Sequence, residues 1–149
     1  MENMIVYIDE AAYAIQMLTP MLPSGEARTP TRWIVVGCAP RITHNASKWV
    51  THSARQSWRG KWAEKVFAQI VPLLKSPSDV VITQVASGPL CDLTEGLLAQ
   101  YGVARVLDAR RPKLGQDLSP VTRHQPREPQ GVWGYAAVVA SAGVLLAAD

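Results

Sequence analysis

The stretch of residues 79–115 constrains the fold most, because its pattern predicts a strand, a helix and a second strand in direct succession. The run DVVITQV is apolar and β-branched, which favours a buried strand, and the turn-forming sequence Ser-Gly-Pro ends it. The leucines that follow recur at steps of three and four, as on one face of a helix, and Gly102 stands where a helix C-terminus favours a left-handed residue. Residues 103–109 are again short and apolar. Such a unit predicts parallel strands, and the loop after its second strand, where ligands commonly bind, is cationic here.

The alternation of strand and helix already begins near the N-terminus. Residues 4–8 and 32–38 are apolar runs, and the spacing of apolar residues predicts helices over 11–22 and 53–75. The expected strands are apolar throughout rather than alternating, which is typical of a sheet with helices on both faces. We therefore predict an α/β three-layer sandwich with a mostly parallel sheet of at least four strands and a C-terminal hydrophobic helix. The expected strands are 4–8, 32–38, 80–85 and 103–109.

Length and composition are consistent with one globular domain and a C-terminal tail. Of the 149 residues 48% are hydrophobic and 18% charged, enough for a core, and the net charge of +3 permits an anionic partner without requiring one. We expect an α/β domain over residues 1–115, a polar linker rich in Pro, Arg and Gln over 116–131, and a hydrophobic segment over 132–148. The N-terminus lacks the basic region of a signal peptide, which predicts a cytoplasmic protein.

The hydrophobic segment 132–148 is a candidate membrane anchor. It is 17 residues long without a charge, and as a helix it would span about 25 Å, the short limit for a bilayer core. Arg123, His124 and Arg127 precede it, so the positive-inside rule would attach the domain to the inner face of the membrane. The alternative is a final helix packed on the edge of the sheet or in a dimer interface, and the sequence leaves both interpretations open.

Two stretches carry a resemblance to a known family. Asp9 ends the first expected strand in IVYIDEAAYA, and GPLCDLTEGLLAQYGVARVLDARRPKLG combines a helix, the Gly102 turn and the cationic loop in order. Together with the order of elements over residues 4–115, these stretches resemble the universal stress protein family, within the wider adenine-nucleotide α-hydrolase-like group. The resemblance implies a non-catalytic stress-response or regulatory protein that binds ATP or another adenine nucleotide. A fifth strand often joins two subunits in this family, and because it is absent here, a homodimer would need another surface.

The resemblance also implies where a nucleotide would bind. In the family the Asp after the first strand helps to hold the adenosine, the end of the second strand lines the base, and a glycine-rich loop after the fourth strand wraps the phosphates. From the residues alone, Asp9 has an alternative role as the cap of the following helix. By position, the nucleotide-binding residues would be Asp9, Cys38, Ala109, Arg110, Arg111, Lys113 and Gly115.

The loop departs from the family pattern of Gly, two residues, Gly, nine residues and then Gly-Ser or Gly-Thr. Ala109 stands at the first glycine, Pro112 lies near the second, and no Gly-Ser or Gly-Thr follows Gly115 at the required distance. Glycines let backbone N–H groups surround a phosphate, and a proline removes one such donor. The cationic side chains of the loop offer charge instead, because guanidinium groups bind phosphate through two hydrogen bonds. The alternative is a membrane-associated scaffold that has lost nucleotide binding.

Residues 41–65 form a basic stretch with interleaved tryptophans. Glu64 is its only acid, and Trp49, Trp58 and Trp62 could dock it on RNA, single-stranded DNA or an anionic membrane surface. Trp58 and Trp62, however, fall at helical spacing with the apolar residues that follow them. The spacing therefore favours a helix whose tryptophans face the core, leaves Trp49 as the exposed one, and makes nucleic acid an unexpected partner.

No catalytic constellation is present. The sequence contains no nucleophile elbow, no HExxH zinc motif and no phosphate-binding P-loop motif, and the pattern shows no partner for Asp108. Cys38 and Cys91 have no metal-ligand spacing and no disulfide framework, so we interpret them as small buried residues in a reducing compartment rather than a redox pair. We therefore expect neither an enzyme nor a metal site, and a nucleotide hydrolase is a further alternative.

Overall fold

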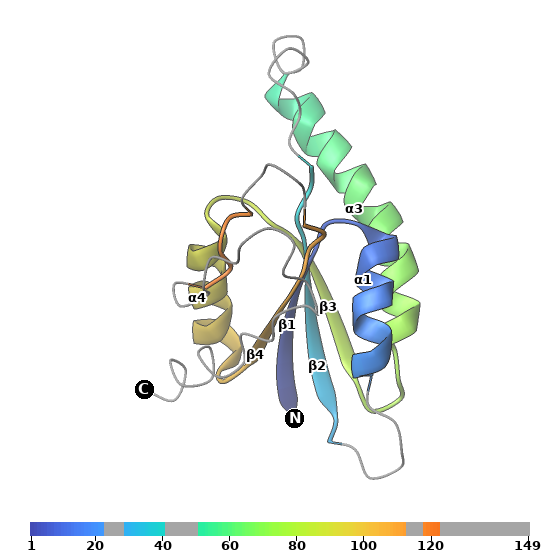
Figure 1. The fold of residues 1–149 in the computed structure, drawn as a ribbon. Coiled ribbons are helices and arrows are strands. Elements are labelled where there is room, and N and C mark those ends of the chain that lie inside the picture. Colours follow the sequence, from blue (N-terminus) through green and yellow to red (C-terminus); the bar gives the residue numbers. More distant parts are fainter. Residues whose placement is uncertain (23–28, 41–50, 113–117, 123–149) are drawn as a thin grey trace.

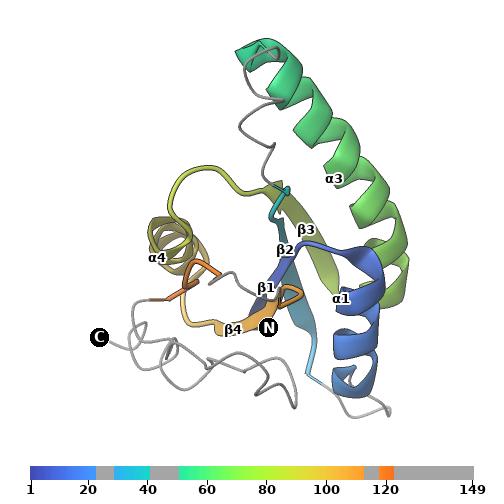
Figure 2. The same cartoon turned by 45° about the horizontal axis from the view of Figure 1, so that its top comes forward.

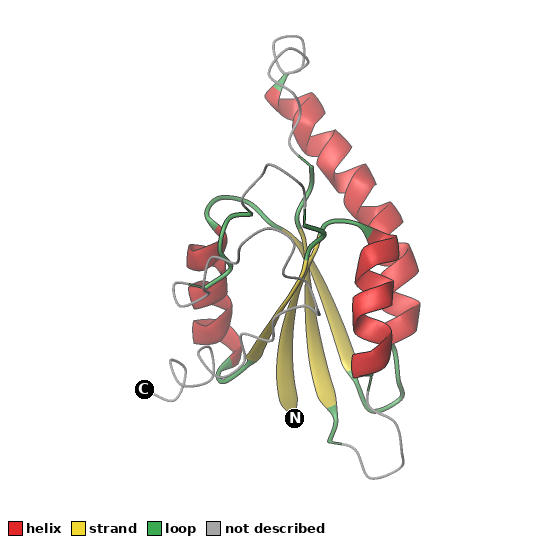
Figure 3. Cartoon of the chain, viewed as in Figure 1, coloured by secondary structure: helices red, strands yellow, loops and turns green. Residues whose placement is uncertain are grey.

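The computed structural model describes residues 1–22, 29–40, 51–112 and 118–122 (Figure 1). Strands and helices alternate along these residues, and helices enclose the sheet from both sides (Figure 3). In chain order the elements are β1 (Glu2–Ile8), α1 (Ala11–Leu18), the 3-10 helix η1 (Thr19–Met21), β2 (Thr31–Gly37), α3 (His52–Leu74), β3 (Val80–Val85), α4 (Leu90–Tyr101) and β4 (Arg105–Ala109).

The sheet of the described residues has four strands in the order β3-β2-β1-β4, and every neighbouring pair is parallel. The central strand β1 is paired on both sides: Ile5 lies opposite Ile34 of β2 and opposite Val106 of β4. The prediction of an α/β fold with a parallel sheet of four strands is therefore confirmed. The C-terminal helix and anchor predicted over 132–148 lie outside the described residues, and none of the described helices has the length and hydropathy needed to span a bilayer.

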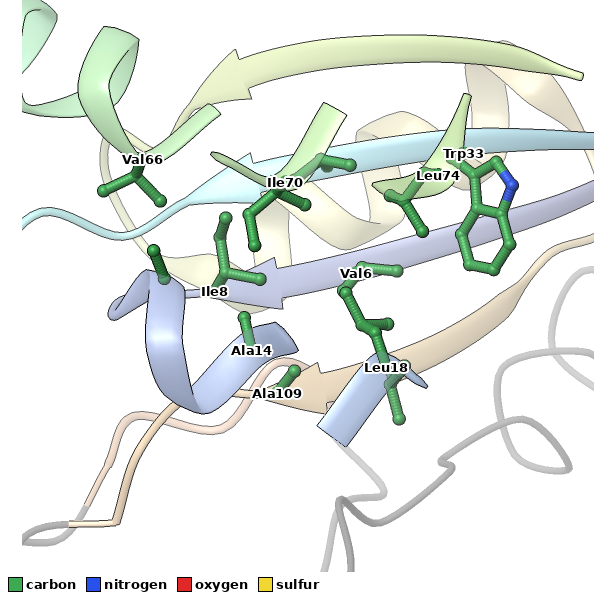
Figure 4. Packing of buried hydrophobic residues seen from close by; sticks show 12 residues of the cluster. Val6, Ile8, Ala14, Leu18, Trp33, Val66, Ile70, Leu74 and Ala109 are labelled. Carbon is green, nitrogen blue, oxygen red and sulfur yellow. The ribbon is translucent and has the colours of Figure 1, made fainter. Parts of the chain in front are cut away.

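The core lies on both faces of the sheet because successive strand residues point to opposite sides. On one face Val6 and Ile8 of β1 pack in a cluster with Leu18 of α1 and Ile70 of α3 (Figure 4). The alternate residues of β1 belong to a second cluster around α4. Its buried members are Ile5, Tyr7, Ile34, Val36, Leu97, Ala104, Val106 and Val121.

The chain changes direction once as it crosses the sheet. From β1 it passes through α1 to β2 and through α3 to β3, moving toward one edge of the sheet along one face. Helix α4 then packs on the opposite face and leads to β4 on the far side of β1. This reversal creates a topological switch point between β1 and β4, and parallel sheets bind ligands outside the carboxyl ends of their strands at such a point.

Two helix ends differ in detail from the predictions. Helix α1 ends at Leu18, and the following residues form η1, in which Pro20 lies in the first turn, where its missing N–H costs nothing. Gly102 ends α4 with a φ of +90°, but its ψ of −155° lies outside the left-handed helical region that the sequence predicts. This backbone conformation still favours glycine, because a β-carbon would clash with the backbone there.

The amino-terminal half of α3 projects beyond the sheet (Figures 1 and 2). Every buried residue of this helix lies in its second half, and these residues are Ala63, Val66, Ile70 and Leu74. Trp62 packs partly against the core, but Trp58 is 41% exposed, so the prediction that Trp58 faces the core is wrong. Helical spacing identifies residues that share a face, but it does not show where the sheet beneath that face ends. Trp49 lies outside the described residues.

Gly37, the last residue of β2, provides the space in which two aromatic rings of α3 pack. A β-carbon at this position would lie 3.0 Å from Cζ of Phe67 and 3.3 Å from Cζ3 of Trp62. We expect Gly37→Ala to lower the free energy of unfolding by about 1–2 kcal/mol, because both rings must shift to relieve the overpacking. Urea denaturation measures this change.

Gly96→Ala in the middle of α4 is the matched control. A β-carbon at Gly96 would meet nothing within 4 Å, so this substitution should raise the free energy of unfolding by about 0.5–1 kcal/mol through the higher helix propensity of alanine. Equal effects of the two substitutions would contradict the packing described at Gly37.

Candidate functional site

The strand ends on both sides of the switch point bring the sequence-predicted residues to one edge of the sheet. Asp9 follows β1, Cys38 follows β2, and Ala109 is the last residue of β4. Because these three strands are neighbours and parallel, their carboxyl ends lie side by side. The backbone N–H of Cys38 donates to the carbonyl of Ile8 over 2.7 Å, and Ala109 lies opposite Ile8, so pairing continues to this edge on both sides of β1.

Asp9 and Arg111 join the loops that follow β1 and β4. The backbone N–H of Arg111 donates to Oδ1 of Asp9 over 2.7 Å, although the two residues are 102 positions apart in the chain. The side chain of Arg111 forms an ion pair with the neighbouring Glu10, with its Nη1 nitrogen 3.0 Å from each carboxylate oxygen. Glu10 is the N-cap residue of α1, but its side chain makes no capping hydrogen bond. The Arg111 and Glu10 side chains are 57% and 45% exposed, so this ion pair faces solvent.

Arg110 lies beside Arg111 in the sequence but points into the protein, with only 5% of its surface exposed. Its Nε and Nη2 nitrogens donate to the two carboxylate oxygens of Asp108 over 2.8 and 2.9 Å, and Nη2 also donates to the carbonyl of Ser119 over 2.5 Å. Burial alone would lower the pKa of Arg110, but the hydrogen bond and the negative charge of Asp108 outweigh it and raise this pKa. Asp108, which has no partner in the sequence pattern, thus compensates a buried charge.

Residues 118–122 pack against α4 and the end of β4, within the segment expected to be a linker. The carbonyl of Val121 lies 2.5 Å from Oγ1 of Thr94, and Val121 itself is fully buried. The Tyr7 hydroxyl is hydrogen-bonded to the same Thr94 oxygen, and the Cys91 thiol donates to the carbonyl of Pro120 over 3.3 Å. Together with the hydrogen bond from Arg110 to Ser119, these contacts attach residues 118–122 to α4 and to the residue that follows β4. No periodic pattern marks so short a segment in the sequence.

The same two carboxylates, those of Asp9 and Asp108, affect the pKa values of ionisable groups near the edge. Burial raises the pKa of the Cys38 thiol to about 12; Arg110 opposes this shift, whereas Asp108 and Asp9 add to it. The pKa of Tyr13, a residue of α1 that the sequence analysis did not single out, is raised by burial first and then by the same two carboxylates. Cys38 is half-buried and stays a neutral thiol at neutral pH, so it offers an apolar surface rather than a nucleophile.

The described part of the edge carries three carboxylates, those of Asp9, Glu10 and Asp108, and two guanidinium groups. Both guanidinium groups already pair with carboxylates of this edge. Lys113 and Gly115, which the resemblance adds to the site, lie outside the described residues. Within the described ranges no group of three or more His, Cys, Asp and Glu side chains is placed to hold a metal ion. Chemically, the described residues of the edge offer one solvent-facing cation, one apolar thiol and several acceptors.

Comparisons of the chain with protein-family models, with curated proteins and with solved structures found no match. The resemblance to universal stress proteins therefore rests on the residues quoted above and stays a hypothesis.

Replacement of Arg110 should be strongly destabilising. We expect Arg110→Ala to lower the free energy of unfolding by about 3–5 kcal/mol, because it leaves the Asp108 carboxylate, which is only 10% exposed, without its buried partner. Arg105→Ala, at the exposed opposite end of β4, should change it by less than about 0.5 kcal/mol. Chemical denaturation of both variants measures the difference, and similar small losses would show that the buried pair contributes little.

Stability should fall at alkaline pH because Tyr7 is buried. Burial raises the pKa of Tyr7 from 10.0 to about 12, although its hydrogen bond to Thr94 opposes the shift. The unfolded chain therefore loses the Tyr7 proton before the folded protein does, and the stability present below pH 10 is lost as the pH rises toward 12. The loss attributable to this group is at most about 2–3 kcal/mol. Urea midpoints measured between pH 8 and 11 should fall more steeply for the wild type than for Tyr7→Phe, and parallel curves would contradict this origin.

Proposed function

We propose that this protein is a non-catalytic regulatory protein that binds an adenine nucleotide at the carboxyl edge of its sheet, between β1 and β4. The parallel sheet and its switch point support a ligand site at this edge. The single observation that carries the proposal is the 2.7 Å hydrogen bond from the Arg111 N–H to Asp9, which joins the two loops that a ligand there would touch. The choice of an adenine nucleotide and of a stress-response role comes from the resemblance to universal stress proteins.

Arg111 is the side chain best suited to contact a phosphate. Its ion pair with Glu10 is exposed on both sides, and exposed ion pairs contribute only about 0–1 kcal/mol, so a ligand can displace Glu10 at small cost. In the pair with Glu10 only one guanidinium nitrogen donates, whereas a phosphate can accept two parallel hydrogen bonds from two nitrogens of a guanidinium group. We assign Arg111 to the phosphate and regard Glu10 as its competitor.

Arg110 and Asp9 would position the backbone of the site rather than bind the phosphate. The guanidinium of Arg110 is committed to Asp108 and to the carbonyl of Ser119, and this commitment fixes the backbone just before Arg111. Asp9 fixes the backbone N–H of Arg111, and its position after β1 is the one that holds adenosine in the resembling family. The half-buried thiol of Cys38 offers the base an apolar contact.

The local charge favours a ligand with few phosphates. The described edge has three carboxylates against two guanidinium groups, and only the guanidinium of Arg111 faces solvent. One phosphate group matches one solvent-facing cation, whereas the further charges of a triphosphate would meet carboxylates. We therefore expect AMP to bind more tightly than adenosine, and ATP to bind no more tightly than AMP.

Isothermal titration of the full chain with AMP, ATP and adenosine tests this proposal. We expect Arg111→Ala to weaken AMP binding about 10-fold or more, since it removes a charge-assisted hydrogen bond, and to leave the weaker binding of adenosine unchanged. Glu10→Gln should strengthen AMP binding several-fold, because it removes the competitor for the guanidinium. Arg105→Ala, which removes an exposed arginine from the opposite end of the same strand, is the matched control and should change neither affinity.

Failure of all three compounds to bind the folded wild-type chain would refute nucleotide binding and favour the alternative of a scaffold that has lost it. Binding that Arg111→Ala and Glu10→Gln leave unchanged would place the nucleotide elsewhere on the protein. Steady release of phosphate from ATP, abolished in Asp9→Ala, would instead show a hydrolase.

A further inference from the structure

The first turns of α3, residues 51–62, extend past the described sheet (Figure 1), and we call them the projecting turns. None of these residues is buried, whereas Ile70 and Leu74 of the same helix lie at 0% and 2% exposure in the core (Figure 4). Oγ1 of Thr51 accepts a hydrogen bond from the N–H of Ala54 over 3.1 Å and so caps the amino-terminal end of the helix. The helix is thus anchored through its buried second half, and its projecting turns extend beyond the carboxyl ends of the strands (Figures 1 and 2).

These turns carry cations and an exposed aromatic ring but no acid. Arg55, Arg59 and Lys61 lie within them, and the first acidic residue of the helix is Glu64. The indole of Trp58 is 41% exposed, and helical spacing places Arg55 and Lys61 on either side of it, three residues away in each direction. Neither Arg59 nor Lys61 forms an ion pair within the described residues. In this they differ from the guanidinium groups at the sheet edge, both of which form ion pairs with carboxylates.

We propose that the projecting turns of α3 bind single-stranded nucleic acid, with Trp58 stacked on a base and Arg59 and Lys61 against the phosphate backbone. An exposed aromatic ring flanked by cations is an arrangement that binds single strands with little sequence preference. This site is separate from the nucleotide site at the sheet edge and uses none of its residues. The sequence-based expectation against nucleic acid depended on Trp58 and Trp62 both facing the core. Trp62 does pack partly against it, but Trp58 is 41% exposed.

Charge and hydrophobicity make other occupants less suitable. A second copy of this surface would bring like charges together, which disfavours a symmetric contact between two α3 helices. Insertion into a bilayer surface needs a stripe of several large apolar residues, but Trp58 is the only large hydrophobic residue exposed in these turns, and Trp62 packs partly against the core. Double-stranded DNA hides its base faces within the stack, so Trp58 could not stack on them.

Fluorescence anisotropy with labelled 12-nucleotide oligo(dT) and oligo(U) tests the proposal on the full chain. We expect binding at 20 mM salt that weakens as salt rises, with a slope of log affinity against log salt no steeper than about −1.4, as the two cations Arg59 and Lys61 allow on a single strand. Trp58→Ala should weaken binding about 5-fold or more, and Trp58→Phe should retain most of the affinity, because the phenyl ring still stacks. Lys61→Ala should reduce the salt slope by about 0.7.

Three controls make the outcome decisive. Lys75→Ala, at the opposite end of α3, and Arg111→Ala, at the sheet edge, should leave oligonucleotide binding unchanged. Circular dichroism of Trp58→Ala should match that of the wild type, since the side chain lies outside the core. Absence of binding at 20 mM salt would overturn the proposal, as would equal affinity for a duplex, equal loss in Lys75→Ala and Lys61→Ala, or binding to vesicles containing anionic lipid but not to oligonucleotides.

Discussion

The pairing of β1 on both of its edges is the constraint on which the rest of the structure depends. Ile5, Val6, Tyr7 and Ile8 have no exposed surface, so water cannot satisfy their backbone N–H and C=O groups, and β2 and β4 must do so. Two parallel neighbours bring three carboxyl ends to one edge, and the return of the chain through α4 makes that edge a switch point. The juxtaposition of Asp9 and Arg111 therefore follows from the hydrogen bonding of a buried strand, before any ligand is considered.

Arg110 and Arg111 are adjacent in the sequence, but their different burial gives them different roles. The strand β4 alternates between the two faces of the sheet, and its end directs Arg110 inward, where a charge is tolerated only with a well-placed partner. Asp108 supplies that partner through two hydrogen bonds, and Ser119 adds a third from the segment that closes over α4. Arg111 is left with an exposed and exchangeable partner. One residue of the pair therefore stabilises the fold of the site, and the other is available to a ligand.

The sequence predicts much of the fold because its strands are uniformly apolar and its helices are periodic. The four strands and the helices α3 and α4 follow from those patterns, and so does the gathering of Asp9, Cys38 and Ala109 at one edge. Three features do not follow. The burial of Arg110 is completed by a hydrogen bond to a five-residue segment without periodicity. The exposure of Trp58 depends on where the sheet ends, and the ion pair of Glu10 joins loops that are distant in the chain. Each of these features depends on tertiary contacts between distant segments, and the sequence pattern within one segment does not indicate which other segment it contacts.

The two candidate anion-binding surfaces differ in whether their cations are paired with carboxylates, and this difference affects how each would select a ligand. At the sheet edge both described cations, Arg110 and Arg111, already have carboxylate partners, so their attraction at a distance is weak and selection depends on hydrogen-bond geometry at short range. In the projecting turns of α3 the charges of Arg59 and Lys61 have no such partners within the described residues, so their field extends to about one Debye length, roughly 8 Å at physiological salt. The first surface suits a small ligand of defined shape. The second suits a polyanion, which can follow a row of charges while its bases stack on Trp58, because neither interaction requires one fixed ligand geometry.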